Sequence, residues 1–479
     1  MKGEFLYKRG EKMLFSSLSF LYYFLPVVII LYFIAPTKIK NLILLAVSLI
    51  FYFCGEPIYV FLMLGTIFLA YIHAILIDKY RGTKLSKVFL VSSIVITVSL
   101  LGFFKYTDFF IENINNVLGT SVALLKIALP IGISFYTFQV LSYVIDVYRG
   151  NAKVQKSFLN LATYVSLFPQ LIAGPIVRYT SVEEDLEHRK HTFEGFAEGA
   201  TRFIIGLAKK ILIANVLGEL CQDFRLCEDK TVLFYWLYAV AFSLHIYFDF
   251  SAYSDMAIGI GRMLGFKFPE NFNYPYISKS ITEFWRRWHM SLSTWFRDYI
   301  YIPLGGNRVG KFKLYRNILI VWLLTGFWHG AAWNFIVWGL FFAVLLMIEK
   351  AFLGKILEKL PSVISRFYLL FLVIISFVIF NADGMTQAIQ DIGGMFGLNG
   401  VPLVNDLSIY YLQSYLVIFI LAIIGATPFI KNTVLKLKEN ENARKVINIL
   451  EPMLIVVLLV VCTAYLVDGS FNPFLYFRF

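Results

Sequence analysis

Long apolar runs, separated by short polar or basic segments, follow one another along almost the whole chain. The runs lie at 14–35, 41–54, 57–77, 88–105, 121–147, 200–220, 232–261, 317–348, 363–381, 408–428 and 446–467. Most are long enough for a helix that crosses a bilayer, which takes roughly 17–25 residues. The pattern therefore predicts an all-α polytopic membrane protein with roughly ten to twelve transmembrane helices.

Two runs do not fit a simple crossing. The shorter run at 157–177 contains Pro169, Gly174 and Pro175, and proline removes a backbone donor, so we expect a re-entrant element there. The run at 317–348 is long, and the basic residues on both sides of it favour the same face of the membrane. A break near 328–330 would explain this, and one long tilted helix is the alternative.

A third segment, 281–299, shows the three- and four-residue spacing of an amphipathic helix. Its aromatic residues share one face, and His289 falls on the opposite, polar face with Arg286. Such a helix is expected to lie in the plane of the lipid headgroups, with its aromatic side chains as an anchor.

Composition and charge support a membrane location. The chain is 59% hydrophobic and only 15% charged, whereas soluble domains carry about a quarter charged residues. The net charge of +12 comes from short clusters between apolar runs, which is the positive-inside pattern and does not indicate nucleic acid. It predicts that 262–316 is cytoplasmic and that 383–406, which has no Lys or Arg, is exterior. We expect 1–12 to be a polar N-terminal appendage and 13–479 a single membrane domain.

Two histidines indicate chemistry. His329 lies in the middle of the apolar run from Ile318 to Met347. An imidazole is costly to hold inside a bilayer and titrates near neutral pH, so a lone histidine at this depth predicts a functional site. Together with His289, about forty residues upstream, it predicts acid/base chemistry at a membrane. No metal site is expected.

The span at 232–261 carries three further polar candidates, His245, Asp249 and Asp255. His245 and Asp249 are four residues apart and share a helix face. Carboxylates at this depth must be paired or line a wet cavity. They form either a structural polar cluster that joins helices or the wall of a tunnel that reaches His329.

Several segments together resemble the alginate O-acetyltransferase branch of the membrane-bound O-acyltransferase (MBOAT) family. The matching segments are Leu129–Gln139, Ser142–Arg149, Phe168–Pro175, Tyr247–Gly259, Phe284–Ser293, Gly326–Gly330 and Phe474–Phe479. The resemblance implies a ring of membrane helices, with re-entrant and interfacial helices, around a central tunnel in a multi-pass protein of the bacterial plasma membrane.

The resemblance also implies an activity. His329 would be the catalytic histidine and His289 the second histidine, while Trp328 would help to exclude water and Arg286 would hold the phosphates of the donor or contact lipid headgroups. An acetyl group would pass from a cytoplasmic thioester, acetyl-CoA, to a hydroxyl of a secreted polysaccharide, with no bound cofactor. Transfer would be direct or through an extracytoplasmic partner with a serine-esterase-like fold, beside a polysaccharide synthase and export machinery. The alternatives are D-alanyl transfer to teichoic acid, a transporter or flippase, and a scaffolding subunit.

Overall fold

The computed structural model describes residues 13–398, 400–469, 472–473 and 475. The appendage expected at 1–12 lies outside the described residues. The chain clusters into two compact units. The first consists of the residues up to Phe203 and of Tyr253–Pro269, and the second of Ile204–Ala252 and the residues from Glu270 onward.

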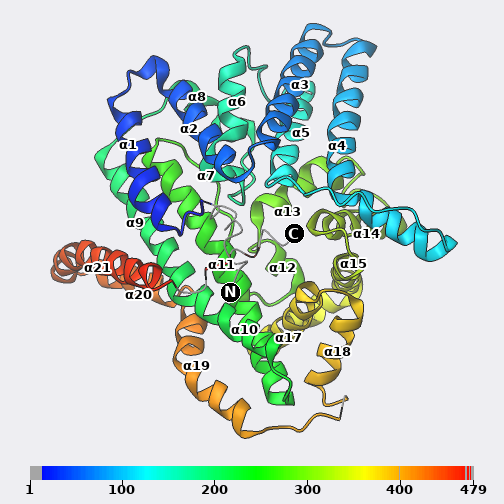
Figure 1. The fold of residues 1–479 in the computed structure, drawn as a ribbon, viewed down its shortest axis with the longest axis vertical. Coiled ribbons are helices and arrows are strands. Elements are labelled where there is room, and N and C mark those ends of the chain that lie inside the picture. The colour runs from blue at the N-terminus through cyan, green and yellow to red at the C-terminus, as the bar shows by residue number, and fades with distance from the viewer. Residues whose placement is uncertain (1–12, 399, 470–471, 474, 476–479) are drawn as a thin grey trace, which may run out of the picture. The chain divides into compact units, whose positions relative to one another are not determined.

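The first unit contains the N-terminal helices (Figure 1). They are η1 (Phe20–Phe24), α1 (Leu25–Ile34), η2 (Thr37–Ile39), α2 (Lys40–Gly55), α3 (Tyr59–Lys79), α4 (Lys84–Leu118), α5 (Ile133–Arg149), α6 (Phe158–Ser166), α7 (Phe168–Leu171), α8 (Tyr179–Glu187) and the greater part of α9 (Phe193–Ala208). Helix α3 packs against α4, α5 and α6, and its buried face carries Ile67, Ala70 and Ala74.

The second unit contains the remaining helices. They are η3 (Lys209–Asn215), α10 (Val216–Leu226), most of α11 (Val232–Met263), η4 (Pro275–Ile277), α12 (Ile281–Trp285), α13 (Met290–Phe296), η5 (Arg297–Tyr301), α14 (Lys311–His329), α15 (Trp333–Ile348), η6 (Glu349–Leu353), α16 (Gly354–Leu357), α17 (Ser362–Asn381), α18 (Met385–Met395), α19 (Asp406–Gly425), α20 (Phe429–Lys438) and α21 (Glu441–Val467). Its apolar core is formed mainly by α11, α15 and α17 together with the aromatic residues of α12.

Among the described residues, eight helices are long and apolar enough to cross a membrane. They are Thr37–Gly55, Tyr59–Lys79, Lys84–Leu118, Val232–Met263, Trp333–Leu357, Ser362–Asn381, Asp406–Gly425 and Glu441–Val467, and a shorter apolar helix covers Phe20–Ile34. The apolar runs outnumber these helices because some runs do not form one continuous helix. The run at 121–147 is helical only from Ile133, since Pro130 and the left-handed Gly132 (φ +74°) precede the helix.

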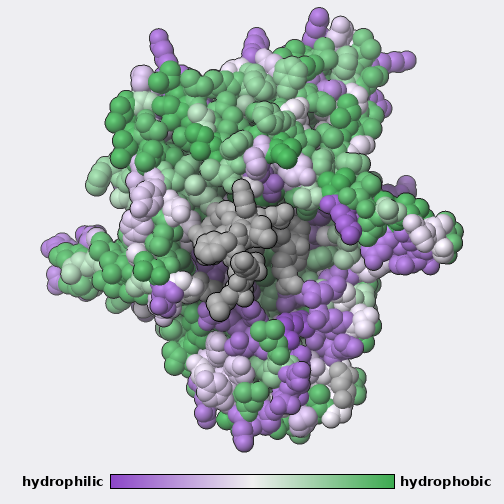
Figure 2. All heavy atoms as spheres, viewed as in Figure 1, coloured by the Kyte–Doolittle hydropathy of each residue, from purple (hydrophilic) through white to green (hydrophobic). Residues whose placement is uncertain are grey.

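The outer surfaces of these helices are apolar, as expected for a multi-pass membrane protein. Helices α3 and α4 of the first unit present a largely hydrophobic face (Figure 2); Phe61, for example, is 71% exposed. In the second unit, only 6% of the most apolar 18-residue stretch of α21 is buried. Such faces are suited to lipid, and in water they would be an aggregation hazard.

Both irregular runs are broken where the sequence predicts. In the first unit, α6 ends at Ser166 and the four-residue α7 follows, so 157–177 is not a continuous helix. In the second unit, α14 ends at His329 and α15 begins at Trp333, which confirms the break and rules out the single tilted helix. The two helices pack closely, since a Cβ atom on Gly339 would lie 2.4 Å from the Trp322 carbonyl oxygen.

The continuous amphipathic helix expected at 281–299 is wrong. The segment forms two short helices, α12 and α13. Directly before α13, His289 adopts the left-handed backbone conformation (φ 43°, ψ 54°). Its aromatic side chains are buried in the protein and do not serve as a headgroup anchor; Phe284 is 0% and Trp288 is 5% exposed. The helical spacing of the aromatic residues could not reveal the four-residue gap between α12 and α13.

Candidate active site

His329 is the last residue of α14, directly before the turn that leads into α15. Its side chain is buried, and its ring centroid lies 5.0 Å from that of Trp338 and 5.2 Å from that of Phe380. Both aromatic rings meet the imidazole at an interplanar angle of 84°. The histidine is therefore held by the edges and faces of rings from α15 and α17.

A small cavity of about 20 Å³ adjoins His329. It is lined by Ile246, Asp249, Phe250, Trp288, His329, Trp338, Phe377, Phe380 and Leu475. A cavity must offer at least about 10–15 Å³ to hold one water molecule, so this one admits only a small group. Apart from His329, the one ionisable side chain among these lining residues is Asp249.

Asp249 is charge-paired with Lys210 of η3. The Lys210 Nζ lies 2.6 Å from an Asp249 carboxylate oxygen, and both side chains are at most 2% exposed. The same lysine donates to the Pro473 carbonyl oxygen, and the backbone N–H of Leu475 donates to Asp249 at 2.9 Å. The pair thus fixes a piece of the C-terminal segment beside the cavity.

His289 is buried next to the same wall. Its ring centroid lies 4.7 Å from that of Phe250, and its Nδ1 lies 3.1 Å from the Asn271 side-chain oxygen. The Asn271 oxygen also accepts from the Ser291 hydroxyl at 2.9 Å, and the Asn271 carbonyl oxygen accepts from the Met290 N–H. Burial lowers the pKa of His289 to about 3, so the ring is neutral at neutral pH. His289 is only 1% exposed, so its polar helix face turns toward the protein interior and not toward water.

Trp328 lies between the two histidines. Its indole ring is 5.0 Å from the His329 ring and 6.0 Å from the His289 ring, centroid to centroid. It is buried but is not among the residues that line the small cavity. An aromatic side chain therefore links the two residues that the sequence singled out.

His245 and Asp255 do not join Asp249 in the cavity wall. His245 Nδ1 lies 2.6 Å from the Ala214 carbonyl oxygen. Asp255 belongs to the first unit, where it is paired with Arg202 at 2.8 Å. Helical spacing correctly placed His245 and Asp249 on one helix, but it could not show which partner each side chain meets.

A second, larger cavity of about 300 Å³ lies beside α12–α14. Its lining is mostly apolar and aromatic, with three basic residues, Arg286, Arg297 and Lys350. Thr325 lines it, one helical turn before His329 on α14, and Trp285, which also lines it, lies 5.7 Å from Trp338 of the small cavity. The aromatic linings of the two cavities therefore lie next to each other at this pair of tryptophans.

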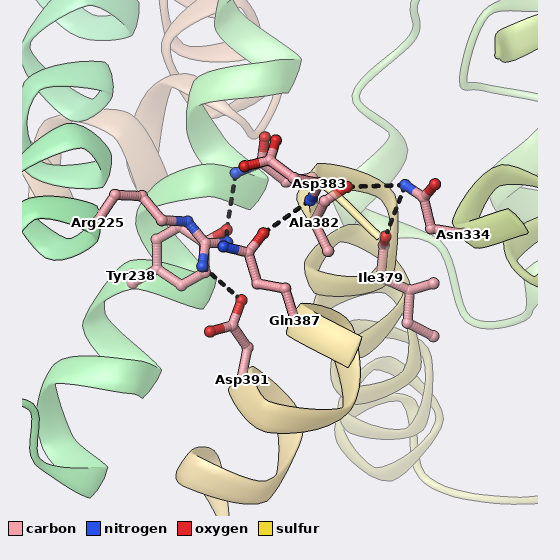
Figure 3. Close-up of polar contacts among 9 residues, drawn as sticks. Arg225, Tyr238, Asn334, Ile379, Ala382, Asp383, Gln387 and Asp391 are labelled. Carbon is pink, nitrogen blue, oxygen red and sulfur yellow. Dashed lines mark hydrogen bonds and ion pairs between the residues drawn. The ribbon is translucent and has the colours of Figure 1, made fainter. Parts of the chain in front are cut away.

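A polar network that the sequence did not predict secures the turn between α17 and α18 (Figure 3). The Asn334 amide at the start of α15 donates to the Ala382 carbonyl oxygen at 2.9 Å and lies 3.4 Å from the Phe380 carbonyl oxygen. On the other side of the turn, Arg225 of α10 pairs with Asp391 of α18 at 2.7 Å. Because Phe380 contacts His329, this network helps to fix one wall of the histidine site.

The fold is that of a multi-pass membrane protein, and its second unit holds a buried histidine at a small cavity, with a larger cavity nearby. Residues 152–383 match the model of the membrane-bound O-acyltransferase family, and this range includes both histidines. Relatives identical to this chain at well above 30% extend the match to nearly its full length. The chain belongs to this family.

The relatives narrow the class. The probable alginate O-acetylase AlgI of Pseudomonas aeruginosa is 43% identical over 80% of this chain and 75% of its own length. The probable alginate O-acetylase AlgI of Azotobacter vinelandii is 38% identical over 98% of this chain and 100% of its own length. The peptidoglycan O-acetyltransferase of Helicobacter pylori is 36% identical over 82% of this chain and 81% of its own length. The chain is a membrane-bound O-acetyltransferase and a multi-pass protein of the bacterial plasma membrane.

Proposed function

We propose that this protein transfers an acetyl group from a cytoplasmic thioester, acetyl-CoA, to a hydroxyl of a secreted polysaccharide, with His329 as the general base. The observation that carries this assignment is the burial of His329 at a cavity of about 20 Å³ walled by aromatic rings. A base near its working pH can take the proton of a weakly nucleophilic alcohol as the alcohol attacks. The aromatic wall keeps out the bulk water that would hydrolyse the donor.

His289 has a supporting role in this proposal. Because burial lowers its pKa, its neutral ring can donate a proton or hydrogen bond from one nitrogen and accept with the other. Its 3.1 Å contact with Asn271 fixes the orientation of the ring. We assign it as a relay or hydrogen-bond donor at the edge of the site and not as a second cation.

The larger cavity is suited to the donor. Its apolar lining can hold an extended pantetheine-like arm, and Arg286 and Lys350 supply positive charge for phosphate groups, while Arg297 is paired with Asp298. Thr325, which lines this cavity, lies one helical turn before His329 on α14, which supports a thioester bound near the histidine. Contact with lipid headgroups is the competing role for these exposed cations.

On the exterior side, the acceptor is a hydroxyl group. The relatives are named for acetylation of alginate and peptidoglycan, which supports a polysaccharide as the final acceptor here. Consistent with the family resemblance, a serine-esterase-like extracytoplasmic partner would receive the acetyl group or pass it on, beside the machinery that makes and exports the polymer.

The test is the acetyl ester content of the secreted polymer from cells that carry His329→Ala on the chromosome. Ester content, measured by proton NMR, should fall to background while the amount of membrane-inserted protein stays at the wild-type level. His73→Gln is the matched control, since His73 lies in α3 and binds Leu69 and Ser92 within the first unit. That variant should retain acetylation.

Near-normal acetylation in His329→Ala would remove His329 from the mechanism. D-alanyl esters in place of acetyl esters would assign the protein to the D-alanyl branch. Loss of polymer export in cells lacking the protein, without any change in ester content, would instead support a transporter or a scaffolding subunit.

A further inference from the structure

The indole N–H of Trp338 is buried without a hydrogen-bond partner. Trp338 of α15 is 1% exposed, and its Nε1 has no acceptor in the part of the chain that the structure describes. Leaving a buried donor unsatisfied costs about 1–3 kcal/mol. A buried polar atom without a partner in a well-packed region calls for a reason, and catalysis is one such reason.

The indoles of the second unit differ in this respect: those of Trp285 and Trp338 are buried without an acceptor in the part of the chain that the structure describes, whereas that of Trp236 has one. The Trp236 Nε1 donates to the Met395 carbonyl oxygen at 2.9 Å. Trp338 differs in its surroundings, which are aromatic rings: Phe342 and Phe380 both lie 5.2 Å away, centroid to centroid. Ring faces are weak acceptors compared with a carbonyl oxygen, so the N–H remains available to a stronger acceptor.

Trp338 and His329 line the same small cavity, and their rings are 5.0 Å apart. Among the remaining lining side chains, the indole of Trp288 is the other group with an N–H, and none carries a hydroxyl, an amide or a second cation. The cavity thus combines a base, His329, with the indole N–H of Trp338, which is buried without an acceptor among the described residues. An acetyl carbonyl has one oxygen that needs such a donor when it becomes negatively charged.

We propose that the Trp338 indole N–H is a catalytic hydrogen-bond donor to the carbonyl oxygen of the acyl group. This rests on the proposed role of His329. The acceptor oxygen bonds to the carbonyl carbon as its proton passes to His329, and the carbonyl electron pair moves onto the oxygen that Trp338 holds. When the carbonyl re-forms, the carbon–sulfur bond breaks, and the leaving thiolate takes the proton from His329.

Close packing of α14 against α15 restricts the movement of the Trp338 side chain. The next residue, Gly339, lies where α15 crosses α14, and a Cβ atom there would be 2.4 Å from the Trp322 carbonyl oxygen. On α14, a Cβ atom on Gly326 would lie 2.5 Å from the Phe335 carbonyl oxygen. This close crossing fixes the indole relative to the histidine at the end of α14. A donor placed before the reaction stabilises developing charge without a reorganisation penalty.

The experiment compares Trp338→Phe with wild type in purified, full-length protein, with acetyl-CoA as the thioester and a hydroxyl acceptor present. Phenylalanine keeps an aromatic ring but removes the N–H. Loss of one oxyanion donor lowers kcat by roughly 10²–10³-fold, and we expect a fall of about 10²-fold in thiol release with the KM for acetyl-CoA changed less than about threefold. Trp236→Phe is the matched control and should lower the melting temperature while leaving kcat unchanged.

A second variant separates the N–H from the shape of the ring. Benzothienylalanine, introduced at position 338, places sulfur where the N–H stood and preserves the bicyclic ring. It should match the kcat of Trp338→Phe with a wild-type melting temperature. A wild-type kcat in the benzothienylalanine variant would overturn the proposal. If that variant keeps the wild-type kcat while His329→Ala releases no thiol, only the role of Trp338 is contradicted. If wild type itself releases no thiol, the proposed function fails first.

Discussion

At the residue scale, the backbone of His289 explains why its side chain is buried. A residue other than glycine with φ near +43° is uncommon and needs support from its surroundings. Asn271 supplies that support. Its side-chain oxygen accepts hydrogen bonds from the N–H and hydroxyl of Ser291, and its carbonyl oxygen accepts one from the Met290 N–H. The turn directs the imidazole toward Phe250 and away from solvent.

The lowered pKa of His289 predicts a pH effect on stability. The pKa of a histidine is about 6.5 in an unfolded chain and about 3 here, so the unfolded state binds more protons between these values. The contribution of the neutral His289 ring to the free energy of unfolding should therefore be complete above about pH 6.5. It should decline as the pH falls toward 3. The melting temperature in detergent should show this decline, and it should be shallower in His289→Gln. Equal slopes in the two proteins would contradict the burial of a neutral ring.

Residue types alone identified part of the candidate site. His329 and Asp249 share one cavity, with His289 and Trp328 close by, because a polar group in an apolar run must find a protected place. The sequence did not reveal Trp338, Phe380 or Asn271. Their importance depends on contacts with residues far away in the chain, and an apolar run offers no reason to choose one tryptophan over another.

At the element scale, the turn between α17 and α18 is fixed by Asn334. We expect Asn334→Ala to lower both the melting temperature and the acetylation rate. Without the Asn334 side-chain amide, the carbonyl oxygens of Phe380 and Ala382 lose a hydrogen-bond donor. Asn405→Ala removes the N-cap of α19 and should cost about 1 kcal/mol of stability without a change in rate. Equal rates in both variants would show that the α15–α17 contact does not position His329.

The elements also show where pattern reasoning succeeds. The break in 317–348 was predictable, because charge on both flanks conflicted with one crossing and glycines flank His329. The continuous helix over 281–299 was not ruled out by its sequence, because both short helices keep the spacing of one long helix. The interruption depends on Asn271, which lies outside the segment and becomes its partner only in the fold.

At the scale of the whole molecule, the positive-inside pattern predicts a cytoplasmic location for the segment that carries Arg286. In a background with the four native cysteines replaced by serine, Lys313→Cys should react with a membrane-impermeant maleimide only after the cells are opened. Leu403→Cys, exposed in the segment expected on the exterior, should react in intact cells. Labelling of Lys313→Cys in intact cells would reverse the direction of acyl transfer that we propose.

The most direct test of the central claim is thiol release from acetyl-CoA by purified protein in lipid nanodiscs, with wild type and His329→Ala compared at equal protein concentration. An acyltransferase whose base is His329 must release free CoA in the presence of a hydroxyl acceptor, and the variant must reduce that rate by at least about 10²-fold, the low end of the usual general-base contribution. Equal rates of thiol release from the two proteins would contradict the account.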